Sequence, residues 1–171
     1  MNSDEIKALS KVTALSEESL VEIGRITVHF SLLEIAVINL VHRLLGIPAQ
    51  RSRTITSELS FRGLQHLASS LVKERRPSRS AEFTSLLKKV ATCEDKRNLI
   101  SHSVWGVGGL ATNGSQIIIR TKYTSKQTRG LRFARQEMTS EDLNIISRQI
   151  SIAAFDVEVF AASLKLKPIT I

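Results

Sequence analysis

Apolar residues recur along one helical face over much of the chain, and this pattern predicts about four helices. The first predicted helix begins after Ser16, a residue type that accepts hydrogen bonds from the free backbone N–H groups at a helix start. It ends at Gly46 and Pro48, because both residue types stop helices. Apolar positions of this helix at steps of three, four or seven are Ile23, Phe30, Leu33, Val37, Leu40 and Leu44.

The same helix is apolar beyond one stripe, which predicts a central position or a subunit interface. Its most apolar run, residues 26–42, approaches membrane length. It nevertheless contains His29, Glu34 and Asn39, so we expect a buried helix and no membrane contact. The additional apolar positions are Ile26, Ile35, Ile38, Val41 and Leu45.

Two further helices are predicted in the middle of the chain. Residues 49–57 are polar and basic and predict a loop or a short turn. A second helix is expected from about Ser60 to Lys73. A third starts near Ser80 and stops before Gly106, with the basic segment Arg75–Arg79 separating the two.

The segment before the last helix has the pattern of a β-hairpin. The glycines of residues 106–109 predict a flexible turn, and residues 115–123 and 131–135 predict two strands joined by a polar loop. The last helix begins at Thr139, with Asp142 three residues later in a capping-box-like arrangement.

These elements predict one mainly α domain over residues 1–171. Its expected architecture is an up-and-down bundle of about four helices, with a β-hairpin inserted at about residues 104–136 before the last helix. A chain of 171 residues, 42% of them hydrophobic, is long enough to bury a core and is not of the disordered class.

Charge and cysteine content narrow the function classes. The net charge is +8, from 24 basic and 16 acidic residues, which favours a polyanionic partner such as nucleic acid without requiring one. The one cysteine, Cys93, permits no intrachain disulfide. The first residues lack the pattern of a secretory signal, so we expect a cytoplasmic protein.

The segment Arg97–His102 carries the strongest candidate chemistry. Arginine neutralises phosphate, and histidine is the side-chain type suited to proton transfer near neutral pH. Asn98 and His102 are four residues apart and can touch on a helix. Arg97 and His102 are five apart, about 140° around a helix. One site therefore needs the long reach of the Arg97 side chain, a helix end near Ser101, or residues from two subunits. The alternative is a structural arginine and a histidine that stabilises the helix C-terminus.

Glu34 is a second candidate because it is the only Asp, Glu, Lys or Arg between Arg25 and Arg43. A buried carboxylate needs a partner, and Arg97 on the apolar stripe of the third helix is the natural one. The pair would be a structural ion pair or would also orient Arg97 toward a phosphate.

The predicted hairpin is basic, with no acidic residue between Ile117 and Gln136. Such a ribbon could follow a phosphate backbone. The alternative is a solvated edge on which charge discourages strand addition. The candidate nucleic-acid-binding residues are Arg120, Lys122, Arg132 and Arg135.

No other chemistry competes with these residues. No His, Asp or Glu cluster has metal-ligand spacing, and there is no glycine-rich phosphate loop or nucleophile elbow. Cys93 lies on a core stripe, where an inert thiol is expected. We therefore expect neither a metal nor another cofactor.

The segment Arg97–His102 has four residues between its arginine and its histidine, and it resembles the R-x(4–6)-H motif of the HEPN superfamily. Asn98 matches the polar residue that often follows that arginine. Residues 30–34 are similar to the acidic helix of bacterial HEPN-like proteins, and Trp105-Gly106 with the hairpin looks like a bacterial subgroup. The resemblance covers most of the chain.

The resemblance implies a helical bundle that dimerises so that the two motifs meet across the interface. It implies a metal-independent RNase, often a toxin of a defence or toxin–antitoxin module, with an antitoxin or other protein as partner. His102 would act as general acid or base, Arg97 would stabilise charge on the phosphate, and Asn98 and Glu34 would support them. Other members bind nucleotides, RNA or proteins without catalysis, and that alternative stays open.

Overall fold

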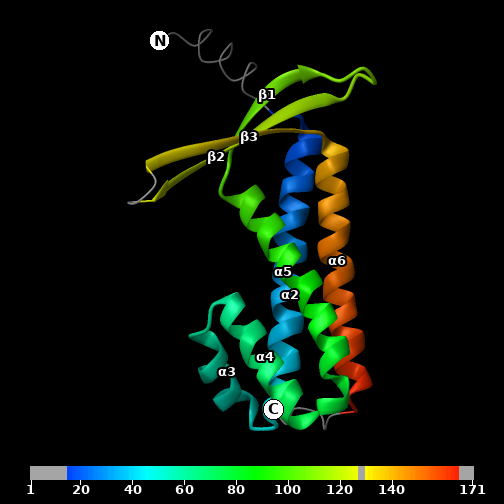
Figure 1. The fold of residues 1–171 in the computed structure, drawn as a ribbon. Helices are drawn as coiled ribbons and strands as arrows, with labels where there is room; N and C mark the ends of the chain where they lie inside the picture. Colours follow the sequence, from blue (N-terminus) through cyan, green and yellow to red (C-terminus); the bar gives the residue numbers. More distant parts are fainter. Residues whose placement is uncertain (1–14, 127–129, 166–171) are drawn as a thin grey trace. The chain divides into compact units, whose positions relative to one another are not determined.

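The computed structural model describes residues 15–126 and 130–165, and it confirms a mainly α fold (Figure 1). A three-stranded antiparallel sheet precedes the last helix. The elements in chain order are α2 (Glu17–Leu45), α3 (Ala49–Ser57), α4 (Phe61–Arg75), the short 3-10 helix η1 (Pro77–Arg79), α5 (Ser80–Ser101), β1 (Val104–Leu110), β2 (Gln116–Lys126), β3 (Gly130–Met138) and α6 (Ser140–Ser163).

Contacts within the chain define two compact units. The first unit combines the chain up to Thr27 with Lys96–Ser147, and so contains the sheet and the end of α5. The second unit combines Val28–Asp95 with the chain from Arg148 onward. The long helices α2, α5 and α6 each contribute residues to both units.

The predicted helix ends are confirmed. The Ser16 hydroxyl accepts a hydrogen bond from the Ser19 backbone N–H at 3.2 Å, which caps the start of α2. Gly46 follows α2 with a φ of +64°, a conformation that costs glycine little. The Thr139 hydroxyl accepts from the Asp142 N–H, and the Asp142 carboxylate accepts from the Thr139 N–H at 2.8 Å. This reciprocal capping fixes the start of α6 directly after the sheet.

The core of the second unit lies where α2 meets its neighbours. The Phe30 and Phe61 rings meet edge to face with centroids 5.0 Å apart, which joins α2 to α4. The Phe83 and Phe160 rings stack at 4.9 Å and join α5 to α6. Burying one such side chain contributes about 1.5–3 kcal/mol. Fully buried apolar side chains of α2 in this unit include Leu33, Leu40, Val41 and Leu44.

Residues 49–57 form helix α3, so the prediction of a loop was wrong. Its sequence lacks apolar periodicity because its inward positions, Ser52 and Thr56, are polar and buried. The Thr56 hydroxyl lies 3.0 Å from His42 Nε2 on α2, and the His42 ring is itself buried. Burial, followed by the nearby Arg53 charge, lowers the pKa of His42. A polar inward face therefore holds α3 against α2.

The glycine-containing segment after α5 is strand β1, so the prediction of a flexible turn at residues 106–109 was also wrong. β1 pairs with β2, which makes a third strand beside the predicted hairpin of β2 and β3. At Gly108 an added Cβ would lie 2.9 Å from the Ile119 side chain. Glycine is needed here because the Ile119 side chain covers the backbone of β1 closely.

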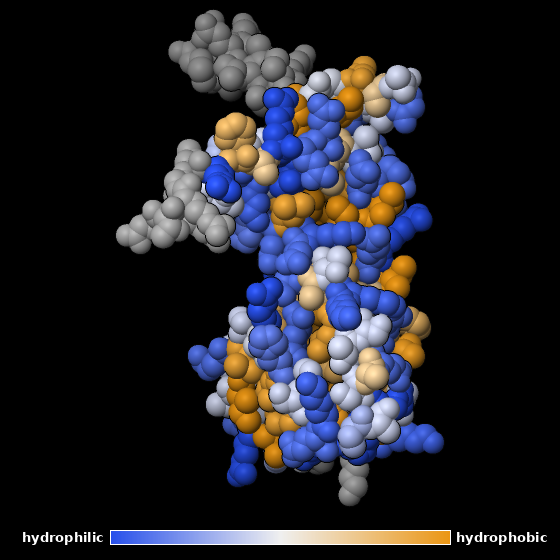
Figure 2. Space-filling view, viewed as in Figure 1, coloured by the Kyte–Doolittle hydropathy of each residue, from blue (hydrophilic) through white to orange (hydrophobic). Residues whose placement is uncertain are grey.

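Both α2 and α6 expose apolar side chains at helical spacing. On α2, Val28 is 61% exposed and Leu32 and Ile35 are each 52% exposed, whereas Ile26 and Leu33 are fully buried. Figure 2 shows hydrophobic patches between the hydrophilic side chains of the viewed face. Exposed apolar residues recur at steps of three, four or seven on α2 at Val21, Val28, Leu32 and Ile35, and on α6 at Ile145, Ile152, Phe155 and Val159.

Helix α2 is also long and apolar enough to cross a membrane by length and composition alone. That test is weak for a single helix, because the core helix of a soluble protein passes it as well. Of the apolar window, 44% is buried inside the protein. The side of α2 that carries Phe30, Leu33 and Leu40 is a core face.

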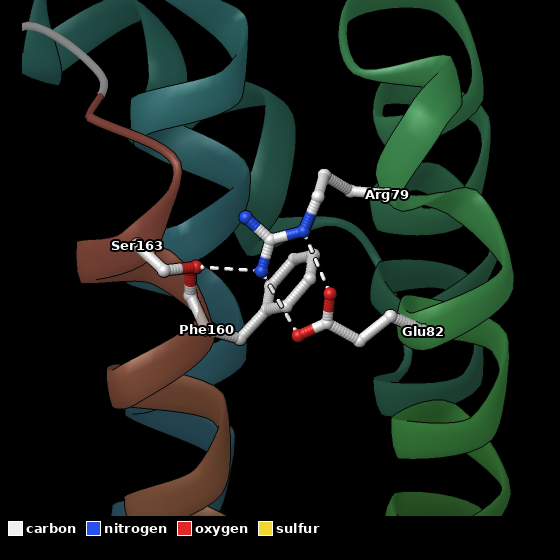
Figure 3. Close-up of polar contacts among 4 residues, drawn as sticks. All are labelled: Arg79, Glu82, Phe160 and Ser163. Atoms are coloured by element: carbon white, nitrogen blue, oxygen red, sulfur yellow. Dashed lines mark hydrogen bonds and ion pairs between the residues drawn. The ribbon is translucent and has the colours of Figure 1, made fainter.

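Arg79 joins the start of α5 to the end of α6 in the second unit (Figure 3). Its guanidinium donates to both carboxylate oxygens of Glu82, at 2.6 and 2.9 Å, and to the Ser163 hydroxyl at 3.0 Å. It also lies over the Phe160 ring, 5.3 Å from the centroid. This cluster satisfies its own charges, so we interpret it as structural.

Replacing Arg79 with alanine is expected to lower the melting temperature at neutral pH. The hydrogen bond from Arg79, and secondarily its charge, lowers the pKa of Glu82 below the ordinary value of 4.5. The stability from this pair is therefore present above pH 4.5 and is lost as the pH falls through the lower pKa of the folded state. Melting curves of wild type, Arg79→Ala and the exposed Arg62→Ala at neutral and acid pH check this. A deficit specific to Arg79→Ala that does not become smaller in acid would contradict it.

Candidate active site at the end of α5

Helix α5 ends within the candidate motif, between Ser101 and His102, and side chains from the following segment hold its last turn. The Ser103 hydroxyl donates to the Leu99 carbonyl, and the Trp105 indole N–H donates to the Ile100 carbonyl at 3.3 Å. These bonds satisfy carbonyls that a helix end leaves free. Ile100 is buried, which anchors this turn in the first unit.

Arg97 and Asn98 are brought together, but Asn98 does not meet the His102 ring. The Arg97 guanidinium donates to the Asn98 side-chain oxygen at 2.9 Å, and both side chains are half-buried. His102 lies just after the helix end, where its backbone N–H donates to the Asn98 carbonyl at 3.3 Å. Its side chain is exposed and makes no hydrogen bond with another residue in the part of the chain that the structure describes.

Helix α5 ends at Ser101, one of the alternatives left open by the sequence, and this end bears on the angle between Arg97 and His102. On a continuous helix these two side chains would point about 140° apart. Because His102 follows the helix as a turn residue, its side chain is not fixed by that helical angle. Glu34 is half-buried and belongs to the second unit, whereas Arg97 belongs to the first. Their predicted pairing stays a prediction.

Arg120, a candidate nucleic-acid-binding residue by its sequence, has a buried side chain. It is 4% exposed, and its guanidinium donates to the Ser103 hydroxyl and the Gln136 side-chain oxygen, each at 3.1 Å. Burial lowers its pKa. Its Nε has no hydrogen-bond partner in the described chain. Arg120 therefore ties β2 and β3 to the residue after His102 and is not available to bind a phosphate backbone in this conformation.

The other predicted nucleic-acid-binding residues remain accessible. Arg132 and Arg135 are exposed on β3, and Lys122 is half-buried on β2. Residues directly opposite each other in the β2–β3 register share a sheet face. Arg135 pairs with Thr121, and Arg132 pairs with Thr124, so the two arginines project from opposite faces. The ribbon is basic on both faces, as the spacing predicts.

The register also reveals two residues that the sequence patterns missed. Tyr123 and Phe133 are directly opposite each other on β2 and β3, and they are 59% and 72% exposed. Strand parity places them on the face of Arg135 and away from the face of buried Ile118 and Met138. In the sequence, each aromatic residue lies in a predicted strand, which is a signal for this pair. Only the β2–β3 register shows that Tyr123 and Phe133 lie side by side.

Comparison with known proteins gives no relative for this chain. It matches no protein-family model, no curated protein and no solved structure. Within residues 15–126 and 130–165, no group of three or more His, Cys, Asp or Glu side chains could hold a metal ion. Cys93 is buried and forms no disulfide, and its sulfur lies 3.8 Å from the Gln149 carbonyl oxygen. The candidate chemistry of the described residues therefore lies at the end of α5 and on the sheet.

Proposed function

We propose that this protein is a HEPN-type endoribonuclease that acts as a homodimer, with Arg97 of one protomer and His102 of the other in each site. The observation that carries the proposal is an exposed histidine whose ring is available directly after α5, five residues from an arginine held by Asn98. Histidine and arginine are the side chains that phosphodiester transfer needs when no metal takes part.

The proposed reaction is attack of a ribose 2′-hydroxyl on the adjacent phosphorus. His102 takes the proton of the 2′-hydroxyl while the O2′–P bond forms, and Arg97 stabilises the negative charge that develops on the phosphate oxygens. The P–O5′ bond then breaks, and the departing oxygen receives the proton from His102. The products are a 2′,3′-cyclic phosphate and a 5′-hydroxyl, and no oxidant, reductant or metal is consumed.

The exposed apolar stripe of α2 supports the dimer. Val28, Leu32 and Ile35 lie on the side of the helix opposite the core face, so α2 is apolar on two sides. Apolar surface of this kind is typical of protein–protein interfaces. A twofold dimer would bury the same stripe of both copies at once.

The basic sheet supports RNA as the substrate class. Lys122, Arg132 and Arg135 add to a net charge of +8. From the HEPN resemblance we extend the proposal to a toxin or defence role in the cytoplasm, with an antitoxin or another protein as a regulatory partner.

The proposal is tested by incubating the purified protein with structured and unstructured RNAs in excess chelator. We expect cleavage that chelator does not reduce, with 2′,3′-cyclic phosphate and 5′-hydroxyl ends identified by mass spectrometry. RNA in which the 2′-hydroxyls are methylated should stay intact, because the attacking group is absent. A purified dimer that leaves every RNA uncut would overturn the proposal.

A non-catalytic module that binds RNA, a nucleotide or a protein is the second candidate. One observation favours it: Asn98 binds Arg97, and no side chain of the described chain holds the His102 ring in one orientation. Catalytic bases are usually oriented by a further group. On this alternative the protein cleaves no RNA, so His102→Ala removes no activity.

A further inference from the structure

The sheet presents an exposed face whose composition differs from that of the rest of the ribbon. We define the aromatic face as Val104, Tyr123, Phe133 and Arg135. Val104 and Arg135 both pair with Thr121, and Tyr123 pairs with Phe133, so the four side chains form two neighbouring cross-strand rows. The rows are about 7 Å apart along the strands.

The aromatic rings of this face are far more exposed than core packing would leave them. Phe133 is 72% exposed and Tyr123 is 59% exposed, while Ile118 and Met138 on the opposite face are buried. The sheet therefore packs inward through one face, and the described residues of its unit leave the two rings on the other face exposed. Aromatic side chains of this size contribute little to stability when they stay in water.

The charge of the ribbon selects the kind of ligand that this face fits. Arg135 stands in the row next to the two rings, and Arg132 projects from the opposite side of the same strand. Exposed rings with neighbouring cations bind single-stranded nucleic acid, because bases stack on the rings while phosphates pair with the cations. A duplex keeps its bases stacked on one another and cannot use the rings in this way.

We infer that the aromatic face binds single-stranded RNA by stacking bases on Tyr123 and Phe133, with Arg135 contacting a phosphate. This inference rests on the proposed function and names its substrate class as unpaired RNA. The face begins at Val104, two residues after His102, and Arg120 ties the same sheet to Ser103. Single-stranded RNA bound on this face therefore lies on the sheet, which directly follows the candidate catalytic histidine in the chain.

The inference is tested by fluorescence anisotropy with a labelled single-stranded oligouridylate and a labelled RNA duplex. All proteins carry His102→Ala so that RNA is not cut during the measurement. Tyr123→Ala and Phe133→Ala are each expected to weaken binding of the single strand between about fivefold and a hundredfold, and to leave duplex binding unchanged. Tyr123→Phe should retain the affinity, because the ring is kept.

Leu110→Ala is the matched control, because Leu110 is 73% exposed on β1 and lies outside the aromatic face. It should leave the affinity unchanged. Arg135→Gln should reduce the slope of log affinity against log salt by about 0.7, the value for one phosphate contact to a single strand. Melting curves confirm that each variant folds.

Three results would overturn the inference. The first is unchanged single-strand affinity in both alanine variants, and the second is an equal loss of duplex binding. The third is loss of self-association or of a protein partner while affinity for RNA stays, which would identify the face as a protein interface. The assay is independent of cleavage: tight, ring-dependent binding by a protein that cuts no RNA would remove the nuclease proposal and keep this one.

Discussion

Replacing His102 with alanine is expected to abolish RNA cleavage, with a loss of about 10²–10⁴-fold, while the fold is kept. The side chain is exposed and is not part of the bonds that hold the end of α5, which come from Ser103 and Trp105. Its removal therefore takes away a proton-transfer group and little else. Cleavage rates measured beside circular dichroism and melting curves separate the two effects.

The chain offers a matched control for this substitution in His66, an exposed histidine on α4. His66→Ala should cleave RNA at the wild-type rate. His102 is not the catalytic base if His102→Ala keeps the wild-type rate, or if its loss of activity equals its loss of folded protein. Either result would favour the non-catalytic binding module.

Replacing Leu32 with glutamate is expected to convert the proposed dimer into a monomer and to remove the proposed RNA cleavage with it. The new carboxylate would be buried without a partner in the interface, which costs several kcal/mol and raises the dimer dissociation constant by about a hundredfold or more. Light scattering after gel filtration measures the mass, and the RNA assay measures activity. Activity should fall because each proposed site needs two protomers.

Thr27→Glu controls for the added charge, because Thr27 is exposed on the same helix, five residues and about 140° away from Leu32. It should leave the mass and the cleavage rate unchanged. A wild-type protein that is monomeric and active, or a monomeric Leu32→Glu variant with full activity, is incompatible with the shared site.

The helices that local signals define could be predicted from the sequence. Ser16 and Gly46 bound α2, and Thr139 with Asp142 begins α6, because each signal is a hydrogen bond or a backbone conformation within four residues. Helix α3 escaped prediction because its buried positions are polar. Its place depends on the His42–Thr56 contact, which no local pattern contains.

The sheet shows the same division between local and long-range information. The β2–β3 hairpin was predicted from the β-branched run at residues 117–119, the mixed apolar and basic residues 131–135 and the polar loop between them. Strand β1 depends instead on pairing with β2 across a separate connection. From the sequence alone, Gly108 has the pattern of a turn residue. Glycine is needed there because the Ile119 side chain of the neighbouring strand β2 packs closely against its backbone.

The candidate site was predictable in composition more than in arrangement. Arg97 and His102 were found from chemistry and spacing, but Asn98 contacts Arg97 and not the histidine ring. Arg120 and Lys122 are two residues apart and share one face of their strand. The structure shows that Arg120 is nevertheless buried and donates hydrogen bonds to Ser103 and Gln136. Burial depends on tertiary packing, which charge patterns along the chain do not record.

Each proposed active site takes Arg97 from one protomer and His102 from the other. This shared site is tested most directly by co-expressing Arg97→Gln and His102→Ala chains with different tags and purifying the heterodimer. Each variant alone should be inactive. The heterodimer contains one site with both residues intact, so we predict that it cleaves RNA at about half the wild-type rate. A heterodimer as inactive as its two parents would contradict the shared site.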